Sequence, residues 1–203
     1  MARRKDHTPE ELKELVLNTV IDSLQTAPAS QLSLRKVAKM VGYSPGTLIN
    51  LFGSYDYLLL AVNGQTLDLI FKQLKNAMEK EVNTEEQLTQ FALTYLQFAK
   101  LHPFQWLILF EHHLPHDAEI PEWQLERINR LFNLIETALK EIAPNASEND
   151  IQQTSRTIWA AVHGICLLEV DDKLFADKSL NAKEMIRQLL VNYFNSWKNN
   201  HNS

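Results

Sequence analysis

The sequence has little of what would crosslink a small protein or break its helices. Cys166 is the only cysteine among 203 residues, so no disulfide can form within the chain, and a lone thiol in an apolar segment suits a reducing compartment. Five glycines and few alternating β-branched runs argue against sheets. No window approaches the roughly 20 apolar residues of a membrane span, and the charged N-terminus has no signal-peptide pattern. We therefore expect a cytoplasmic, all-α protein that does not enter membranes.

The sequence also lacks the motifs of most enzymes. It has no glycine-rich phosphate loop, no nucleophile motif and no metalloprotease signature. One acidic and histidine-rich cluster resembles a metal site, but Pro115 interrupts its helix and no second motif completes a tetrahedral set of ligands. We expect no enzyme, no metal and no cofactor, although a helical metal enzyme stays open as an alternative. The cluster consists of Glu111, His112, His113, His116 and Asp117.

Positive charge is concentrated at the front of an acidic chain. The net charge is −5, yet residues 1–53 carry seven Lys and Arg against five Asp and Glu, whereas residues 54–203 carry thirteen against twenty. An acidic protein does not coat nucleic acid indiscriminately. The asymmetry nevertheless permits a DNA site in the first quarter of the chain.

Helical periodicity runs through the whole chain. Apolar residues recur every three or four positions, Thr8 and Pro9 can open the first helix, and later prolines and glycines mark the breaks. The pattern predicts nine helices, at about 9–24, 33–41, 44–52, 54–81, 84–101, 103–113, 122–142, 148–172 and 182–198.

Residues 33–53 have the pattern of a helix, a glycine turn and a second helix. Val37 and Ala38 face inward, Gly42 supplies a positive φ at the turn, and Leu48 anchors the second helix. The N-terminus of that helix is then free to present N–H groups and small side chains to phosphates and base edges in a major groove. We predict a helix-turn-helix domain at 1–53, joined by a long helix to a helical bundle within 54–203.

At these positions the chain closely resembles the tetracycline-repressor (TetR) family of bacterial regulators. The match is gapless and continues into the long helix. The resemblance implies a homodimeric repressor that binds a palindromic operator and is released by a small-molecule effector. The matching residues are Ser33, Arg35, Val37, Ala38, Gly42, Ser44, Gly46, Thr47, Leu48, Phe52, Leu58 and Leu59.

Three residues depart from the family pattern. Ile49 stands where a tyrosine usually touches the DNA backbone, Leu51 where histidine or tyrosine is frequent, and Tyr55 where a phosphate-binding lysine is common. Each lost lysine contact would lower affinity and flatten its salt dependence. The alternative is a helical small-molecule binding protein with a weakened or lost DNA-binding function. The predicted DNA-binding residues are Arg3, Arg4, Lys5, Ser33, Arg35, Lys36, Ser44, Pro45, Gly46, Thr47, Ile49, Asn50 and Tyr55.

The last two helices carry apolar ladders that need a partner surface. In the TetR family these helices pair with their two-fold mates in a four-helix bundle. Two recognition helices related by a dyad would also read a longer site than one helix can. The predicted dimer interface consists of Ile158, Ala161, Ile165, Met185, Leu189, Tyr193 and Trp197.

Trp159, His163 and Gly164 resemble the Trp-x-x-x-His-Gly signature of one C-terminal subtype of the family. The tryptophan and histidine are four residues apart, and they either form a core pair or line an effector pocket. The family is known for moderately hydrophobic effectors, which an apolar, aromatic cavity would accommodate. The predicted pocket residues are Phe71, Tyr95, Phe98, Trp106, Phe110, Trp123, Trp159 and His163.

Overall fold

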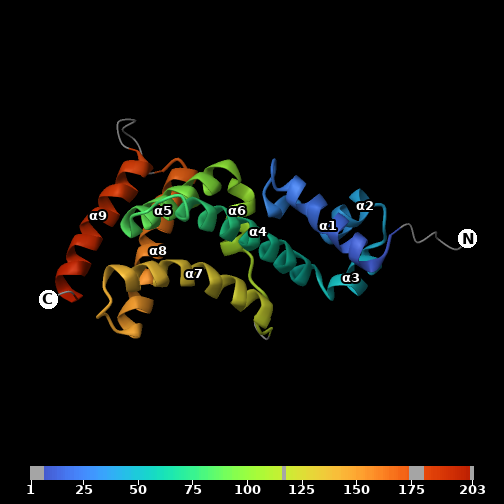
Figure 1. Cartoon of the computed structure of the whole chain (residues 1–203). Coiled ribbons are helices and arrows are strands. Elements are labelled where there is room, and N and C mark those ends of the chain that lie inside the picture. The colour runs from blue at the N-terminus through green and yellow to red at the C-terminus, as the bar shows by residue number, and fades with distance from the viewer. Residues whose placement is uncertain (1–6, 116–117, 174–180, 202–203) are drawn as a thin grey trace, which may run out of the picture. The chain divides into compact units, whose positions relative to one another are not determined.

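A computed structural model describes residues 7–115, 118–173 and 181–201, and within these ranges the chain forms nine α-helices and no strand (Figure 1). The predicted all-α fold is confirmed. The long helix ends at Met78 rather than 81, and the sixth helix at Glu111 rather than 113. The elements are α1 (Pro9–Ser23), the short 3-10 helix η1 (Ala29–Gln31), α2 (Leu34–Met40), α3 (Pro45–Phe52), α4 (Tyr55–Met78), α5 (Thr84–Leu101), α6 (Pro103–Glu111), α7 (Glu122–Ile142), α8 (Glu148–Val170) and α9 (Ala182–His201).

None of the described helices combines the length and hydropathy that a bilayer crossing requires.

The first helix begins where its sequence predicts. Thr8 and Glu11 form a capping box, with the Thr8 Oγ1 accepting from the Glu11 N–H at 3.2 Å and the Glu11 carboxylate accepting from the Thr8 N–H at 2.7 Å.

Packing divides the chain into two compact units, which we describe separately. The first unit consists of Met1–Thr66 and His102–Pro121, and the second of Leu67–Leu101 and Glu122–Ser203. Helix α6 therefore belongs with the helix-turn-helix, and the division falls inside α4. This differs from the domain boundary that the sequence predicts after residue 53, which stays a prediction about function.

The first unit has one apolar core and a polar link to α6. Val16 and Val20 of α1, together with Leu48 of α3, are completely buried. The Gln105 side chain of α6 donates to the Thr66 hydroxyl at 3.0 Å and accepts from the Gln25 side chain at 3.3 Å. Ile108 of α6 is part of this apolar core, and the bonds of Gln105 satisfy the polar side chain that α6 buries there, since buried polar groups are costly unless they are hydrogen-bonded.

The second unit is a bundle in which α5, α7, α8 and α9 pack on one another. Leu139, Ile186 and Leu190 lie at its centre with no more than a trace of exposure. Cys166 is buried there too. Burial, with a smaller contribution from the charge of Glu169, raises the pKa of its thiol to about 12, so the thiol stays protonated at neutral pH.

Candidate nucleic-acid interface

Two serines start the helices of the helix-turn-helix. The Ser33 hydroxyl accepts from the Lys36 N–H at 3.3 Å, and the Ser44 hydroxyl accepts from the Thr47 N–H at 3.1 Å. Gly42 has a φ of +75°, as the turn between α2 and α3 requires. The local geometry is that of N-terminal caps, so both serines have a structural role even before any ligand is considered.

The outer face of α3 is open. Pro45, Gly46, Ile49 and Asn50 are exposed, and Thr47 is half-buried with its hydroxyl 2.9 Å from that of Ser44. Leu48 is completely buried. The sequence-predicted recognition residues therefore lie together at the start and on the outer side of one short helix.

Gly46 has no internal reason to be glycine. A Cβ built there would meet only the Ser44 hydroxyl, at an ordinary 3.8 Å. Glycine in a helix is less favourable than alanine by up to about 1 kcal/mol. The missing side chain is thus best explained by something outside the chain that approaches this helix closely.

Basic residues lie beside α3. Arg35, Lys36 and Lys39 of α2 are exposed, although the Lys36 ammonium donates to the Gln31 carbonyl at 3.1 Å. Figure 1 places α2 and α3 together at the N-terminal end of the first unit.

The predicted N-terminal arm, Arg3, Arg4 and Lys5, lies outside the described residues. The chain that follows it is tied to the turn before α3, because Nδ1 of His7 lies 2.8 Å from the Tyr43 hydroxyl. His7 is exposed and Tyr43 is half-buried.

Tyr55 does not present its hydroxyl to solvent. The oxygen is buried without a hydrogen-bond partner, and burial, followed by the charge of Asp56, raises the pKa of this phenol. In this conformation it cannot reach a phosphate, which argues against the role that the sequence suggests. Leu51 packs against the core of the unit, so its apolar character has a structural explanation.

The predicted pocket residues are divided between the two compact units. Trp106 and Phe110 pack edge to face in the first unit, with ring centroids 5.3 Å apart. Tyr95 belongs to the second unit, where its hydroxyl lies 3.0 Å from Nδ1 of His163, and the His163 ring stacks on Trp159 at 5.1 Å. Burial lowers the pKa of His163. The arrangement matches the core-pair alternative for Trp159 and His163.

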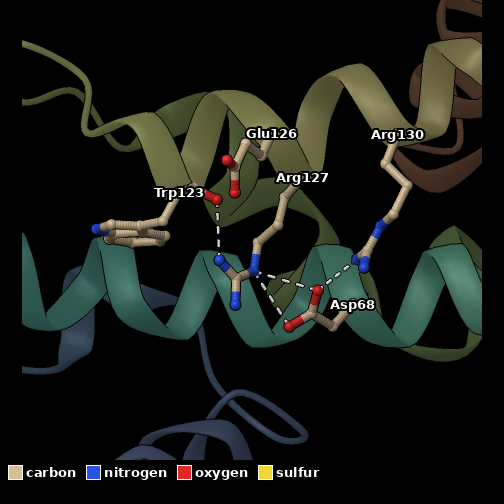
Figure 2. A pocket seen from close by; sticks show the side chains of 5 residues that line it. All are labelled: Asp68, Trp123, Glu126, Arg127 and Arg130. Carbon is tan, nitrogen blue, oxygen red and sulfur yellow. Dashed lines mark hydrogen bonds and ion pairs between the residues drawn. The ribbon is translucent and has the colours of Figure 1, made fainter.

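Trp123, one of these predicted residues, lines a hollow of about 380 Å³ in the second unit. Figure 2 shows Arg127 and Arg130 of α7 reaching toward Asp68 of α4. The Arg127 Nε donates to both Asp68 oxygens at 3.1 Å, and Arg130 donates to one of them at 2.5 Å. The guanidinium of Arg127 also lies 5.2 Å from the Trp123 ring.

Sequence reasoning missed these charged residues. The only available signal was the spacing of Arg127 and Arg130, which are three apart and therefore share a helix face. The aspartate that they meet is about sixty positions away in the sequence. Phe71, a predicted pocket residue, lies beneath the Arg130 guanidinium at 4.1 Å.

The predicted dimer interface is only partly available to a partner. Ile158 and Trp197 are 5% and 7% exposed because they fill the core of their own unit. The remaining predicted residues, Ala161, Ile165, Met185, Leu189 and Tyr193, are half-buried. The predicted interface does not include Leu167, Leu168 and Val191, which are exposed apolar residues on the same two helices. Ala160 and Gly164, small residues of α8 that suit close packing, are exposed and half-buried respectively.

Only part of the acidic and histidine-rich cluster lies in the described chain, where His112 and His113 contact different groups. Nε2 of His112 lies 3.7 Å from Asp56, and burial lowers the pKa of this histidine although Asp56 opposes the shift. Nδ1 of His113 lies 2.9 Å from the Glu111 carbonyl oxygen. His116 and Asp117 lie outside the described residues, and no group of three or more suitable side chains in the described part of the chain could hold a metal ion.

Comparison with curated proteins gives a relative of moderate similarity. The chain is 28% identical over 131 residues to the nucleoid occlusion factor SlmA of Vibrio campbellii. The match covers 64% of this chain and 65% of that protein, so the chain spans just under two thirds of the length of this relative.

Solved structures share the fold over nearly the whole chain. A protein of unknown function from Rhodococcus sp. RHA1 has a TM-score of 0.76 and is 19% identical, with 96% of this chain and 98% of that chain covered. BioQ, solved with its double-stranded DNA operator, has a TM-score of 0.63 at 19% identity, with 90% and 96% covered.

A model of one protein family matches the second half of the sequence. Its description is "Tetracyclin repressor-like, C-terminal domain", and it covers residues 88–193, more than half of the chain. The family is one of regulators rather than enzymes. The chain belongs to the tetracycline-repressor-like (TetR) family.

Proposed function

We propose that this protein is a cytoplasmic, homodimeric transcription repressor that binds a palindromic operator through α3 and leaves it when a small molecule binds. The open face of α3 carries this proposal. Gly46 and Pro45 let a DNA backbone approach the helix N-terminus, where N–H groups favour phosphate, and Asn50 can reach a base edge.

Basic groups around α3 would supply the contacts that Ile49 and Tyr55 do not make. Arg35 and Lys39 are exposed on α2, and the bond between His7 and Tyr43 holds the base of the N-terminal arm close to α3. Arg3, Arg4 and Lys5, which lie outside the described residues, complete the proposed set of basic contacts to the DNA backbone. The operator-bound structure of BioQ supports this use of the fold.

The hollow of Figure 2 is the effector site that we favour. It adjoins Asp68 on α4, and α4 runs from the helix-turn-helix unit into the second unit. A ligand that binds one position of α4 better than another would shift the protein toward the state with weaker DNA affinity. Trp123 offers an apolar ring, while Arg127 and Glu126 offer polar groups, so we expect a flat ligand with polar substituents rather than a purely apolar one.

The exposed faces of α8 and α9 are the proposed dimer interface. Gly164 lies in the interior of α8, and a Cβ placed on it would meet no described atom within 4 Å apart from its chain neighbours and the backbone of its own helix. Val191 on α9 is 55% exposed. Trp159, His163 and Gly164 also fit the Trp-x-x-x-His-Gly subtype, whose assignment remains part of this proposal.

Selection of bound DNA from random fragments, followed by gel shifts at rising salt, tests the repressor function. We expect one enriched palindrome, with half-sites about one helical turn apart. Asn50→Ala should weaken binding to the palindrome about tenfold or more. Asn76→Ala, an equally exposed asparagine on α4, is the control and should have no effect.

Failure of selection has a clear meaning. If no sequence is enriched and no selective shift is seen at any salt concentration, the protein does not repress by binding an operator. The small-molecule binding protein without DNA function would then be the better description. Equal loss of affinity in Asn50→Ala and Asn76→Ala would likewise contradict the recognition role of α3.

A further inference from the structure

A second hollow in the second unit is lined by positively charged side chains. It has a volume of about 430 Å³ and lies between α5 and α9. Lys100 of α5 and Lys183 and Arg187 of α9 line it, and none of the described residues in its lining is a carboxylate. Residues 54–203 as a whole carry thirteen Lys and Arg against twenty Asp and Glu. A hollow lined by cations in an acidic part of the chain favours an anionic ligand.

Two of the three cations are already paired with carboxylates that do not line the hollow. Lys100 pairs with Glu169 of α8, and Arg187 lies 3.6 Å from Glu86 of α5. Both cations keep about half of their side-chain surface exposed, so each retains donors for a ligand. The pairs fix the long side chains at the edge of the hollow, which lowers the entropy lost when a ligand binds.

Lys183 is the cation best placed for an incoming anion. It is exposed in the first turn of α9, a helix of 20 residues, so the helix dipole adds to its charge. Its position in the lining brings it to the same hollow as Lys100 and Arg187.

The rest of the lining, all of it from α5, is half apolar and half polar. Leu93, Leu96 and Leu101 form its apolar part, and Leu101 is 63% exposed. Gln90, Thr94 and Gln97 are its uncharged polar side chains. The volume falls in the range of about 300–1,000 Å³ that is typical of small-molecule sites.

We propose that this second hollow, which we call the α5–α9 groove, binds an amphipathic organic anion. The acidic group would lie among Lys183, Arg187 and Lys100, and the apolar chain along Leu93 and Leu101. The site is separate from the hollow of Figure 2, which has different walls, and it does not depend on DNA binding.

Calorimetric titration of the full chain with sodium decanoate below its micelle concentration tests this site. We expect saturable binding of one decanoate per chain that weakens with salt, because the cations are exposed to solvent. Lys183→Gln should weaken it about fivefold, and Lys183→Gln combined with Arg187→Gln about twentyfold or more. Leu101→Gln should also weaken it, because the apolar wall is lost.

Matched controls separate this site from unspecific binding. Lys72→Gln removes the same charge from an exposed position on α4 that does not line the groove, and it should leave the affinity unchanged. Decyltrimethylammonium, with the same chain and opposite charge, should bind at least tenfold more weakly than decanoate.

Three results would overturn the proposal. They are absence of decanoate binding, equal losses in Lys183→Gln and Lys72→Gln, and loss of binding in Trp123→Leu with retention in Lys183→Gln. The last result would place the anion in the hollow of Figure 2 instead. Circular dichroism of each variant confirms that these surface changes leave the helices folded.

Discussion

At the scale of the residue, Gly46 lowers the stability of α3 but suits the proposed binding of DNA. A helix would be more stable with alanine there, and the fold has room for the methyl group, whose nearest neighbour would be the Ser44 hydroxyl at 3.8 Å. A DNA backbone at the start of α3 would not have that room. One substitution at this position should therefore change stability and DNA affinity in opposite directions.

Gly46→Ala should raise the free energy of unfolding by roughly 0.5 kcal/mol, because alanine loses less backbone entropy on folding. It should also lower operator affinity about tenfold, because the methyl group keeps the phosphate away. Urea unfolding and gel shifts on the selected operator measure the two effects. An affinity equal to that of the unmodified protein would mean that nothing approaches Gly46 closely.

The buried His163 makes stability depend on pH. Burial lowers its pKa below 6.5 in the folded protein, so the unfolded chain binds the proton more readily and stability is lost as the pH falls through about 6.5. His163→Phe keeps a ring against Trp159 but cannot take up the proton. Between about pH 7 and pH 5 its free energy of unfolding should fall less than that of the unmodified protein.

Urea unfolding at a series of pH values tests this comparison. Burial also lowers the pKa of His112, but that histidine is present in both proteins, so it does not affect the difference. Parallel curves for the two proteins would show that His163 does not contribute to acid sensitivity.

At the scale of the element, α4 belongs to both compact units and is joined to α7 by Asp68. The two arginines that meet Asp68 are partly exposed, so solvent weakens each pair. The shared carboxylate nevertheless offsets the repulsion between the two guanidinium groups, which lie three residues apart on α7.

Asp68→Asn should lower the free energy of unfolding by about 1 kcal/mol, because a surface network exceeds a single exposed pair only modestly. Glu79→Gln, which removes the exposed pair with Lys75 near the end of the same helix, is the control and should cost less than about 0.5 kcal/mol. Urea unfolding measures both. Equal effects would show that the Asp68 contacts do not stabilise the bundle.

Local sequence patterns predicted where helices start better than they predicted which helices pack together. Thr8, Ser33 and Ser44 act as the N-terminal caps that their positions in the sequence suggest, because a cap depends on residues three apart. The packing of α6 with the helix-turn-helix could not be foreseen. It depends on bonds such as Gln25 to Gln105, whose residues are eighty positions apart.

At the scale of the whole molecule, periodicity identified which helices are amphipathic but not what covers each face. Ile158 and Trp197 were predicted to meet a second copy, yet they fill the core of their own unit. Their apolar character looks the same in the sequence whichever surface covers it. The same holds for Tyr95, Phe98 and Trp106 of the predicted pocket, which are buried, so that pocket stays a prediction.

The interior glycine of α8 gives the sharpest test of the assembly. A Cβ at Gly164 would meet no described atom within 4 Å apart from its chain neighbours and the backbone of its own helix. We expect Gly164→Arg to leave the protomer folded, which circular dichroism checks. If Gly164 lies at the dimer interface, the arginine would bury a charge without a partner and dissociate the dimer, at a cost of several kcal/mol. Analytical ultracentrifugation should then show monomers, and affinity for the full palindrome should fall as the dimer dissociates.

The control is Gln152→Arg, at an exposed position near the start of the same helix, and this variant should remain dimeric. A dimer that persists in Gly164→Arg would place the interface elsewhere.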